Sequence, residues 1–191
     1  MMLIKTRLRS LAEKHSHRFA SLARNERGVA AVEFAMLLPL MLSLWLGTTE
    51  ISTGIAADRK VTLTARTLAD LTSQVTGLST SDMTNSLTAA TAVIAPYNVG
   101  NLKATVSSIS IDANSKATVA WSVTKNGTAR AVGSSVTLPP ALLIASTCLI
   151  FSEVQYSYKP TIGYVVTGTL TLKDQIYMRP RLSNCVTYPT S

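Results

Sequence analysis

Histidine is nearly missing from this chain, and the shortage excludes much familiar catalytic chemistry. The 191 residues include two histidines, His15 and His17, both near the N-terminus. The rest of the chain therefore lacks the proton carrier of a Ser-His-Asp triad and the commonest ligand of catalytic zinc. No glycine-rich phosphate-binding loop occurs, and the isolated acids Glu153 and Asp174 are expected to be solvated surface groups. We predict that the protein is not an enzyme and uses no cofactor or metal.

Charged residues are also few, at 15% of the chain, and they are unevenly distributed along it. Residues 1–28 hold seven basic and two acidic side chains, so they carry +5 of the total net charge of +8. This basicity flanks an apolar segment and does not indicate a nucleic-acid-binding surface. The positive-inside rule then places the N-terminus in the cytoplasm and exports the chain after Gly47. Arg179 and Arg181, near the C-terminus, are expected to be a structural pair, and the alternative is an anion-binding pair.

Cysteine occurs only twice, at Cys148 and Cys185, both in the part predicted to be exported. There is no Cys-x-x-Cys motif or Cys/His cluster, which disfavours a metal site. In an oxidising compartment two such residues predict a disulfide. The alternative is two separate buried thiols.

The longest apolar stretch, Val29 to Gly47, carries one ionisable side chain, Glu33. As a helix these 19 residues would be about 28 Å long, close to the apolar thickness of a bilayer. A carboxylate there costs about 2.5–3.5 kcal/mol on insertion scales, so Glu33 is expected to have a partner. The alternative is an interfacial carboxylate that reaches out to water. No small-x-small site follows the stretch, which favours an uncleaved anchor, or cleavage before it, over a secretory signal.

Three segments follow from these patterns. Residues 1–28 are a basic cytoplasmic leader, and residues 29–77 hold one long helix that ends near residue 75, with Gly77 as its stop. Its first half, 29–49, spans the membrane with a kink at Pro39. Its second half is amphipathic, with apolar residues three and four positions apart, and must lie against a sheet or a neighbouring subunit. Residues 78–191 form the exported domain.

The exported domain begins with a short helix over 82–95, capped by the Ser79–Asp82 segment. Alternating patterns predict strands at 102–111, 116–124, 148–158 and 169–178, with a short edge strand at 128–138. A phase change between Val106 and Ile109 indicates a bulge. In the second strand Ala117, Val119, Trp121 and Val123 are expected on one face. The predicted fold is therefore α+β, an antiparallel sheet covered on one side by the long helix.

The start of the apolar segment resembles a known family. The family pattern is a basic leader, Gly, a short Ala/Val stretch, Glu-Phe-Ala and a Leu-rich run with Pro. This chain has Gly28-Val29-Ala30-Ala31-Val32-Glu33-Phe34-Ala35, then Leu37-Leu38-Pro39. It is similar to the N-terminal signature of TadE/TadG-type pseudopilins of the Flp (Tad, type IVb) pilus. Tyr156-x-Tyr158-x-Pro160 and Tyr177-Met178-Arg179-Pro180-Arg181 look like C-terminal elements of short members.

The resemblance implies a pilin-like fold and a role in pilus assembly. The prepilin peptidase would cut between Gly28 and Val29, so that Glu33 becomes the fifth residue of the mature chain. Glu33, next to Phe34, would pair with the N-terminal amine of a neighbouring subunit in the inner membrane. The partners would be the major Flp pilin and other minor pilins, with the C-terminal domain in the periplasm. The alternative is a signal-anchored periplasmic binding or tethering protein, in which the helix only anchors.

Overall fold

The structure is a computed structural model that describes residues 26–160, 162–163 and 167–189. Most of the predicted leader, with His15 and His17, lies outside these residues. The chain divides after Thr49 into two compact units. The boundary falls inside the long helix α2 (Glu26–Ser73). The part of α2 up to Thr49 belongs to the first unit, and the part from Glu50 belongs to the second. The helix ends two residues before the predicted end.

In the first unit the structure describes the α2 segment up to Thr49. This segment has apolar side chains on all sides. Its large apolar side chains from Val29 to Trp45 are between 38% and 77% exposed. Pro39 lies inside the helix, as predicted, and has no N–H to donate to Ala35 one turn earlier. The kink expected there stays a prediction. The Ser43 hydroxyl donates to the Pro39 carbonyl oxygen.

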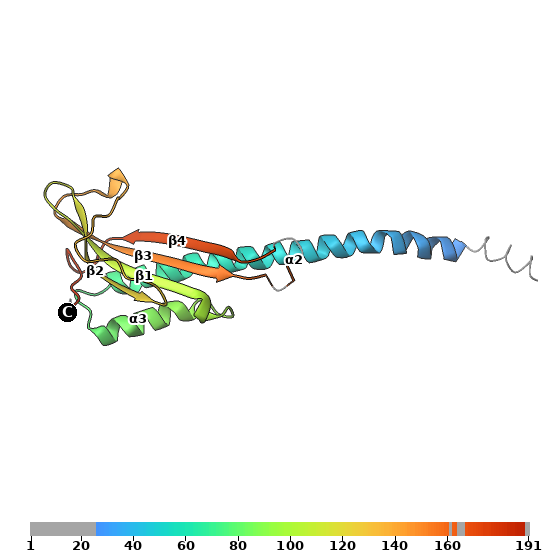
Figure 1. Cartoon of the computed structure of the whole chain (residues 1–191), viewed down its shortest axis with the longest axis horizontal. Coiled ribbons are helices and arrows are strands. Elements are labelled where there is room, and N and C mark those ends of the chain that lie inside the picture. Colours follow the sequence, from blue (N-terminus) through green and yellow to red (C-terminus); the bar gives the residue numbers. More distant parts are fainter. Residues whose placement is uncertain (1–25, 161, 164–166, 190–191) are drawn as a thin grey trace, which may run out of the picture. The chain divides into compact units, whose positions relative to one another are not determined.

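The second unit is built on a four-stranded antiparallel sheet in the order β2-β1-β3-β4. The strands are β1 (Leu102–Ile111), β2 (Ala117–Lys125), β3 (Thr147–Tyr158) and β4 (Leu170–Met178). The α2 segment from Glu50 and helix α3 (Thr80–Ala92) cover one face of this sheet (Figure 1). This arrangement confirms the predicted α+β fold, a long N-terminal helix packed on an antiparallel sheet.

The main core lies between these helices and the sheet. On α2 the buried stripe repeats every three or four residues, and its members are fully buried: Ala57, Val61, Ala65, Leu68 and Ala69. Most are small, which lets the helix lie close to the strands. Alternate residues of β3 face them, namely Val154, Tyr156 and Tyr158. In contrast, Ile51, Ile55 and Leu63 of the same part of α2 are about half exposed.

The predicted bulge exists, but the extra residue is on β2. Ser108 pairs with Trp121 and Ile109 with Val119, so Ala120 has no opposite residue on β1. The pairing of β1 with β3 continues without a shift. The phase change in β1 therefore marks a change of buried face along one regular strand. The prediction that β2 presents one apolar face was wrong, because the bulge turns Ala117 and Val119 to one side of the sheet and Trp121 and Val123 to the other.

A second, smaller core fills part of the opposite face of the sheet. It contains Ile109, Ile111, Ala117, Val119, Leu138, Leu149 and Phe151. The 128–138 segment helps to cover it, but it is not the edge strand that alternation predicted. It makes one isolated bridge, Thr118 with Ser135, and Gly133 interrupts its extended backbone with a φ of +80°. The turn after Pro139 is a short 3₁₀ helix, Pro140–Leu142.

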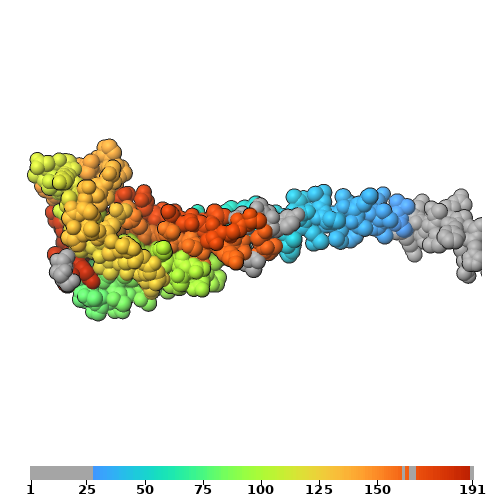
Figure 2. Space-filling model, in the orientation of Figure 1, coloured from blue at the N-terminus to red at the C-terminus, as the bar shows by residue number. Residues whose placement is uncertain are grey.

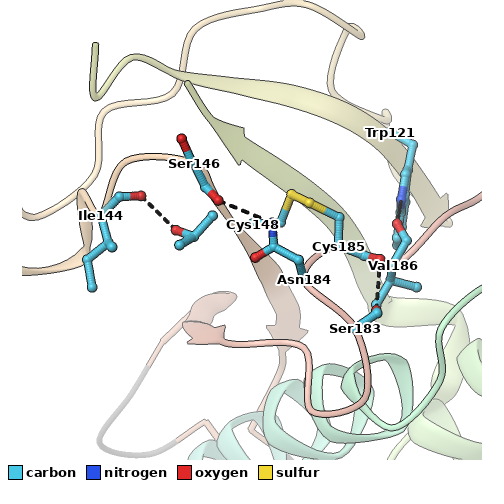
Figure 3. The surroundings of a disulfide bond; sticks show 9 residues. Trp121, Ile144, Ser146, Cys148, Ser183, Asn184, Cys185 and Val186 are labelled. Atoms are coloured by element: carbon cyan, nitrogen blue, oxygen red, sulfur yellow. Dashed lines mark hydrogen bonds between the residues drawn. A yellow bond between two sulfur atoms is a disulfide. The ribbon is translucent and has the colours of Figure 1, made fainter. Parts of the chain in front are cut away.

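The C-terminal tail is fastened across the unit by a disulfide and by hydrogen bonds. Cys148 at the start of β3 and Cys185 form a disulfide, with Cα atoms 5.1 Å apart (Figure 3). The Trp121 indole Nε1 donates to the Val186 carbonyl oxygen at 2.8 Å. Gly77 pairs with Thr187, and a Cβ on Gly77 would meet the Thr187 hydroxyl at 2.6 Å. Gly77 thus serves the close approach of the tail, since the helix has ended earlier.

Helix α3 begins with the predicted cap. The Ser79 side chain accepts a hydrogen bond from the Asp82 backbone N–H, and the Asp82 carboxylate accepts one from the Ser79 backbone N–H. This reciprocal capping box satisfies two backbone donors that the first turn leaves free.

Candidate functional site

The residues that the sequence singled out for function lie together at the start of α2. Apart from its chain neighbours and the helix's own backbone, no described residue has an atom within 4 Å of the place where a side chain on Gly28 would begin. Val29 and Phe34 are 56% and 60% exposed, and Glu33 is exposed as well. Val29 and Glu33 are four residues apart, so they lie on one face of the helix, one turn from each other. The start of α2 therefore offers a backbone accessible at Gly28 and a carboxylate one turn along.

The same segment fits a bilayer. Within the described residues, α2 is the one helix with the length and composition to cross a membrane. None of its most apolar 18-residue stretch is buried. A helix that is apolar all round needs lipid or other helices around it, because water would otherwise meet every side.

Two tyrosines of the second unit, the sheet domain, form hydrogen bonds with the α2 segment that belongs to the same unit. The Tyr97 hydroxyl donates to the Thr53 carbonyl oxygen at 3.1 Å, and the Tyr158 hydroxyl bonds to the Thr53 side chain at 3.1 Å. Burial, together with the nearby Tyr158 and Tyr156, raises the pKa of Tyr97. Sequence reasoning missed Tyr97, since nothing in the local pattern connects it with a helix residue 44 positions earlier.

The other candidates are structural and lie within the second unit. Arg181 forms an ion pair with Asp70 of α2, and its backbone N–H donates to the Ser73 carbonyl oxygen at 2.9 Å. Glu153 is not merely solvated as expected, because both of its oxygens accept from Arg130, each at 2.7 Å. Across the described part of the chain, no group of three His, Cys, Asp or Glu side chains is placed to hold a metal.

The region that matches a known protein family lies in this helix. Residues 28–70 match the family model of TadE-like proteins. The chain carries a TadE-like segment. The match includes Gly28, Glu33 and Pro39, which carried the resemblance in the sequence, and it continues into the sheet-bound part of α2. No curated protein and no solved structure is significantly similar to the chain. The TadE-like segment associates the protein with the Tad pilus.

Proposed function

We propose that this protein is a minor pseudopilin of the Flp (Tad) pilus, acting through helix–helix contacts with other pilins. The observation that carries the proposal is the TadE-like match, which starts at Gly28 on a helix whose large apolar side chains from Val29 to Trp45 are exposed. Such a helix is suited to assembly in a membrane, where packing of neighbouring helices replaces lipid. No catalytic step is proposed.

Glu33 is the residue that would make assembly specific. A buried carboxylate is tolerable in a low-dielectric environment only when it is neutralised or paired with a charge of opposite sign. Cleavage after Gly28 by the prepilin peptidase would create an ammonium group on Val29. In a neighbouring subunit shifted along the helix axis, this ammonium can meet Glu33. Phe34 beside it would pack against the neighbouring helix.

The proposed location follows from the same helix. The basic residues before Gly28 would stay in the cytoplasm, the first half of α2 would cross the inner membrane, and the sheet domain would lie in the periplasm. The disulfide between Cys148 and Cys185 is compatible with an oxidising compartment. The major Flp pilin and other minor pilins are the proposed partners.

The first experiment is N-terminal sequencing and intact mass measurement of the protein purified from its own membrane. A mature chain beginning at Val29 supports processing by the prepilin peptidase. A chain that retains residues 1–28 would remove the ammonium–Glu33 pair and favour a permanently anchored protein.

The second experiment replaces the carboxylate. Glu33→Ala is expected to abolish pilus assembly while leaving the membrane level of the protein unchanged, with pili counted by electron microscopy. Ser43→Ala, in the same exposed part of α2, is the matched control and is expected to keep assembly. Normal pili with Glu33→Ala would contradict the proposal, since a helix that only tethers the domain has no need of this carboxylate.

A further inference from the structure

The face of the sheet opposite α2 carries a polar groove that pilus assembly through α2 does not use. In the orientation of Figures 1 and 2, β3 and β4 lie in front of the sheet-bound part of α2, so this face is turned to the viewer. The groove has a volume of about 570 Å³. Three strands and the loop after β2 line it, with Lys103, Thr105, Gly127, Thr128, Arg130, Glu153, Gln155, Lys173 and Gln175 among the lining residues.

Strand register puts two lysines in one row across the floor of the groove. Lys103 on β1 pairs with Gln155 on β3, and Gln155 pairs with Lys173 on β4. Both lysines are exposed. Neighbouring strands lie about 4.8 Å apart, so the backbones of the two lysines are separated by roughly 9.6 Å. The groove floor therefore presents two cations with an amide between them.

The next row along the strands contains the acidic residue Glu153, whose charge is neutralised by Arg130. Thr105, Glu153 and Gln175 form this row. The Arg130 guanidinium binds both Glu153 oxygens at 2.7 Å and lies 5.1 Å from the centre of the Phe151 ring. The hydrogen bond to Glu153 also raises the pKa of Arg130, so the guanidinium keeps its charge at neutral pH.

One other acidic residue lines the groove. Asp174 alternates with Lys173 and shares its strand face with Leu172 and Ile176, which pack against the helix-side core. Its carboxylate accepts a hydrogen bond from the Gln175 backbone N–H at 2.7 Å. The open floor is consequently positive, with Lys103 and Lys173 as its unneutralised charges on that face.

We propose that this groove binds an acidic polysaccharide, with carboxylates on the two lysines and hydroxyls on the amide and threonine side chains. Amides and hydroxyls can both donate and accept, which suits a chain of sugar hydroxyls. A peptide partner normally anchors through apolar and aromatic side chains in well-packed pockets. Among the residues that line this groove, Val154 is the one large aliphatic side chain and none is aromatic.

The test measures binding of oligogalacturonate to the full chain in detergent micelles by isothermal titration calorimetry. The double variant K103Q/K173Q is expected to raise Kd at least about tenfold, equivalent to about 1.4 kcal/mol. The matched control K116Q/K159Q removes two exposed lysines elsewhere on the same unit and is expected to leave Kd within about twofold, under 0.5 kcal/mol. Both variants should unfold at the wild-type temperature, because all four side chains are exposed.

A second variant and two other probes complete the test. Gln155→Glu places a carboxylate between the lysines and is expected to weaken oligogalacturonate binding without removing a cation. A neutral cello-oligosaccharide of equal length should not compete. The proposal is overturned if oligogalacturonate does not bind, if poly-glutamate of equal length binds as tightly, or if both double variants weaken binding equally. None of these outcomes depends on pilus assembly, so they separate this inference from the proposed function.

Discussion

The two halves of α2 belong to one helix but use their side chains in opposite ways. Up to Thr49, every large apolar side chain from Val29 to Trp45 is exposed. From Glu50, apolar residues of the buried stripe pack against the sheet, and polar residues occupy much of the remaining surface. The second half is stabilised within its own chain by burial. The first half has no such burial in the described chain, and an all-apolar helix needs lipid or other helices around it for burial.

The sharpest test of this contrast is a pair of identical substitutions. Leu68→Ala removes a fully buried side chain and should lower the free energy of unfolding of the sheet domain by about 2–5 kcal/mol. Leu42→Ala, in the exposed half, should leave that free energy unchanged. Urea unfolding in micelles measures both, with Trp45→Phe as the background so that fluorescence reports Trp121. Equal losses from the two variants would remove the distinction between the halves.

Removing the disulfide tests whether the C-terminal tail stabilises the sheet domain that packs on the second half of α2. Cys148 and Cys185 close a loop of 37 residues, and such a cross-link typically contributes about 2–4 kcal/mol. The double variant Cys148→Ser and Cys185→Ser is expected to lower the urea midpoint of the sheet domain. It should leave the membrane insertion of the first half unchanged, as measured by alkaline extraction of membranes. A variant that detaches from the membrane would contradict the independence of the two halves.

A smaller effect is expected at the end of α2. Asp70 pairs with Arg181 of the tail, and both side chains remain partly exposed. Solvent screens exposed pairs, so Asp70→Asn should cost about 0.2–1 kcal/mol, less than the disulfide variant. A double-mutant cycle with Arg181→Gln isolates the coupling. A coupling that survives 1 M salt unchanged would show that the pair is not screened as this exposure requires.

Local patterns in the sequence predicted the parts of the fold that depend on local physics. The spacing of Val61, Ala65 and Leu68 predicted the buried stripe, and the Ser79–Asp82 segment predicted a cap at the start of helix α3. The location of the bulge was missed, because a change of buried face and an inserted residue give the same phase change in one strand. The polar groove was missed as well. Its Arg130–Glu153 pair joins a loop to a strand 23 residues later, and only the folded register puts Lys103 and Lys173 in one row.

The site on the exposed half was predicted for a different reason. Glu33 is conspicuous in the sequence because a carboxylate is costly among 18 apolar or small neighbours, whatever the tertiary fold. The neighbouring subunit that would pair with it is not encoded locally. The contrast between the halves of α2 thus also separates what one chain can specify from what an assembly must supply.

The smallest predicted effect is a pH dependence of the stability of the sheet domain, and it arises at the start of helix α3. Hydrogen bonds from the Ser79 hydroxyl and backbone N–H lower the pKa of the Asp82 carboxyl. Since the folded-state pKa lies below the unfolded one, the unfolded state binds more protons between the two values. The stabilisation is therefore complete above the unfolded pKa, about 3.9, and is lost as pH falls through the folded pKa.

Asp82→Asn removes this titration. The difference in urea midpoint between wild type and Asp82→Asn should be largest near neutral pH and should shrink on acidification below about pH 4. In a Ser79→Ala background the same substitution should have a smaller pH-dependent effect, because the hydroxyl that contributes most to the lowered pKa is gone and the backbone N–H of residue 79 remains. A difference that grows on acidification would mean that Asp82 stabilises the domain in its protonated form. The capping box would then not be the source of the shift.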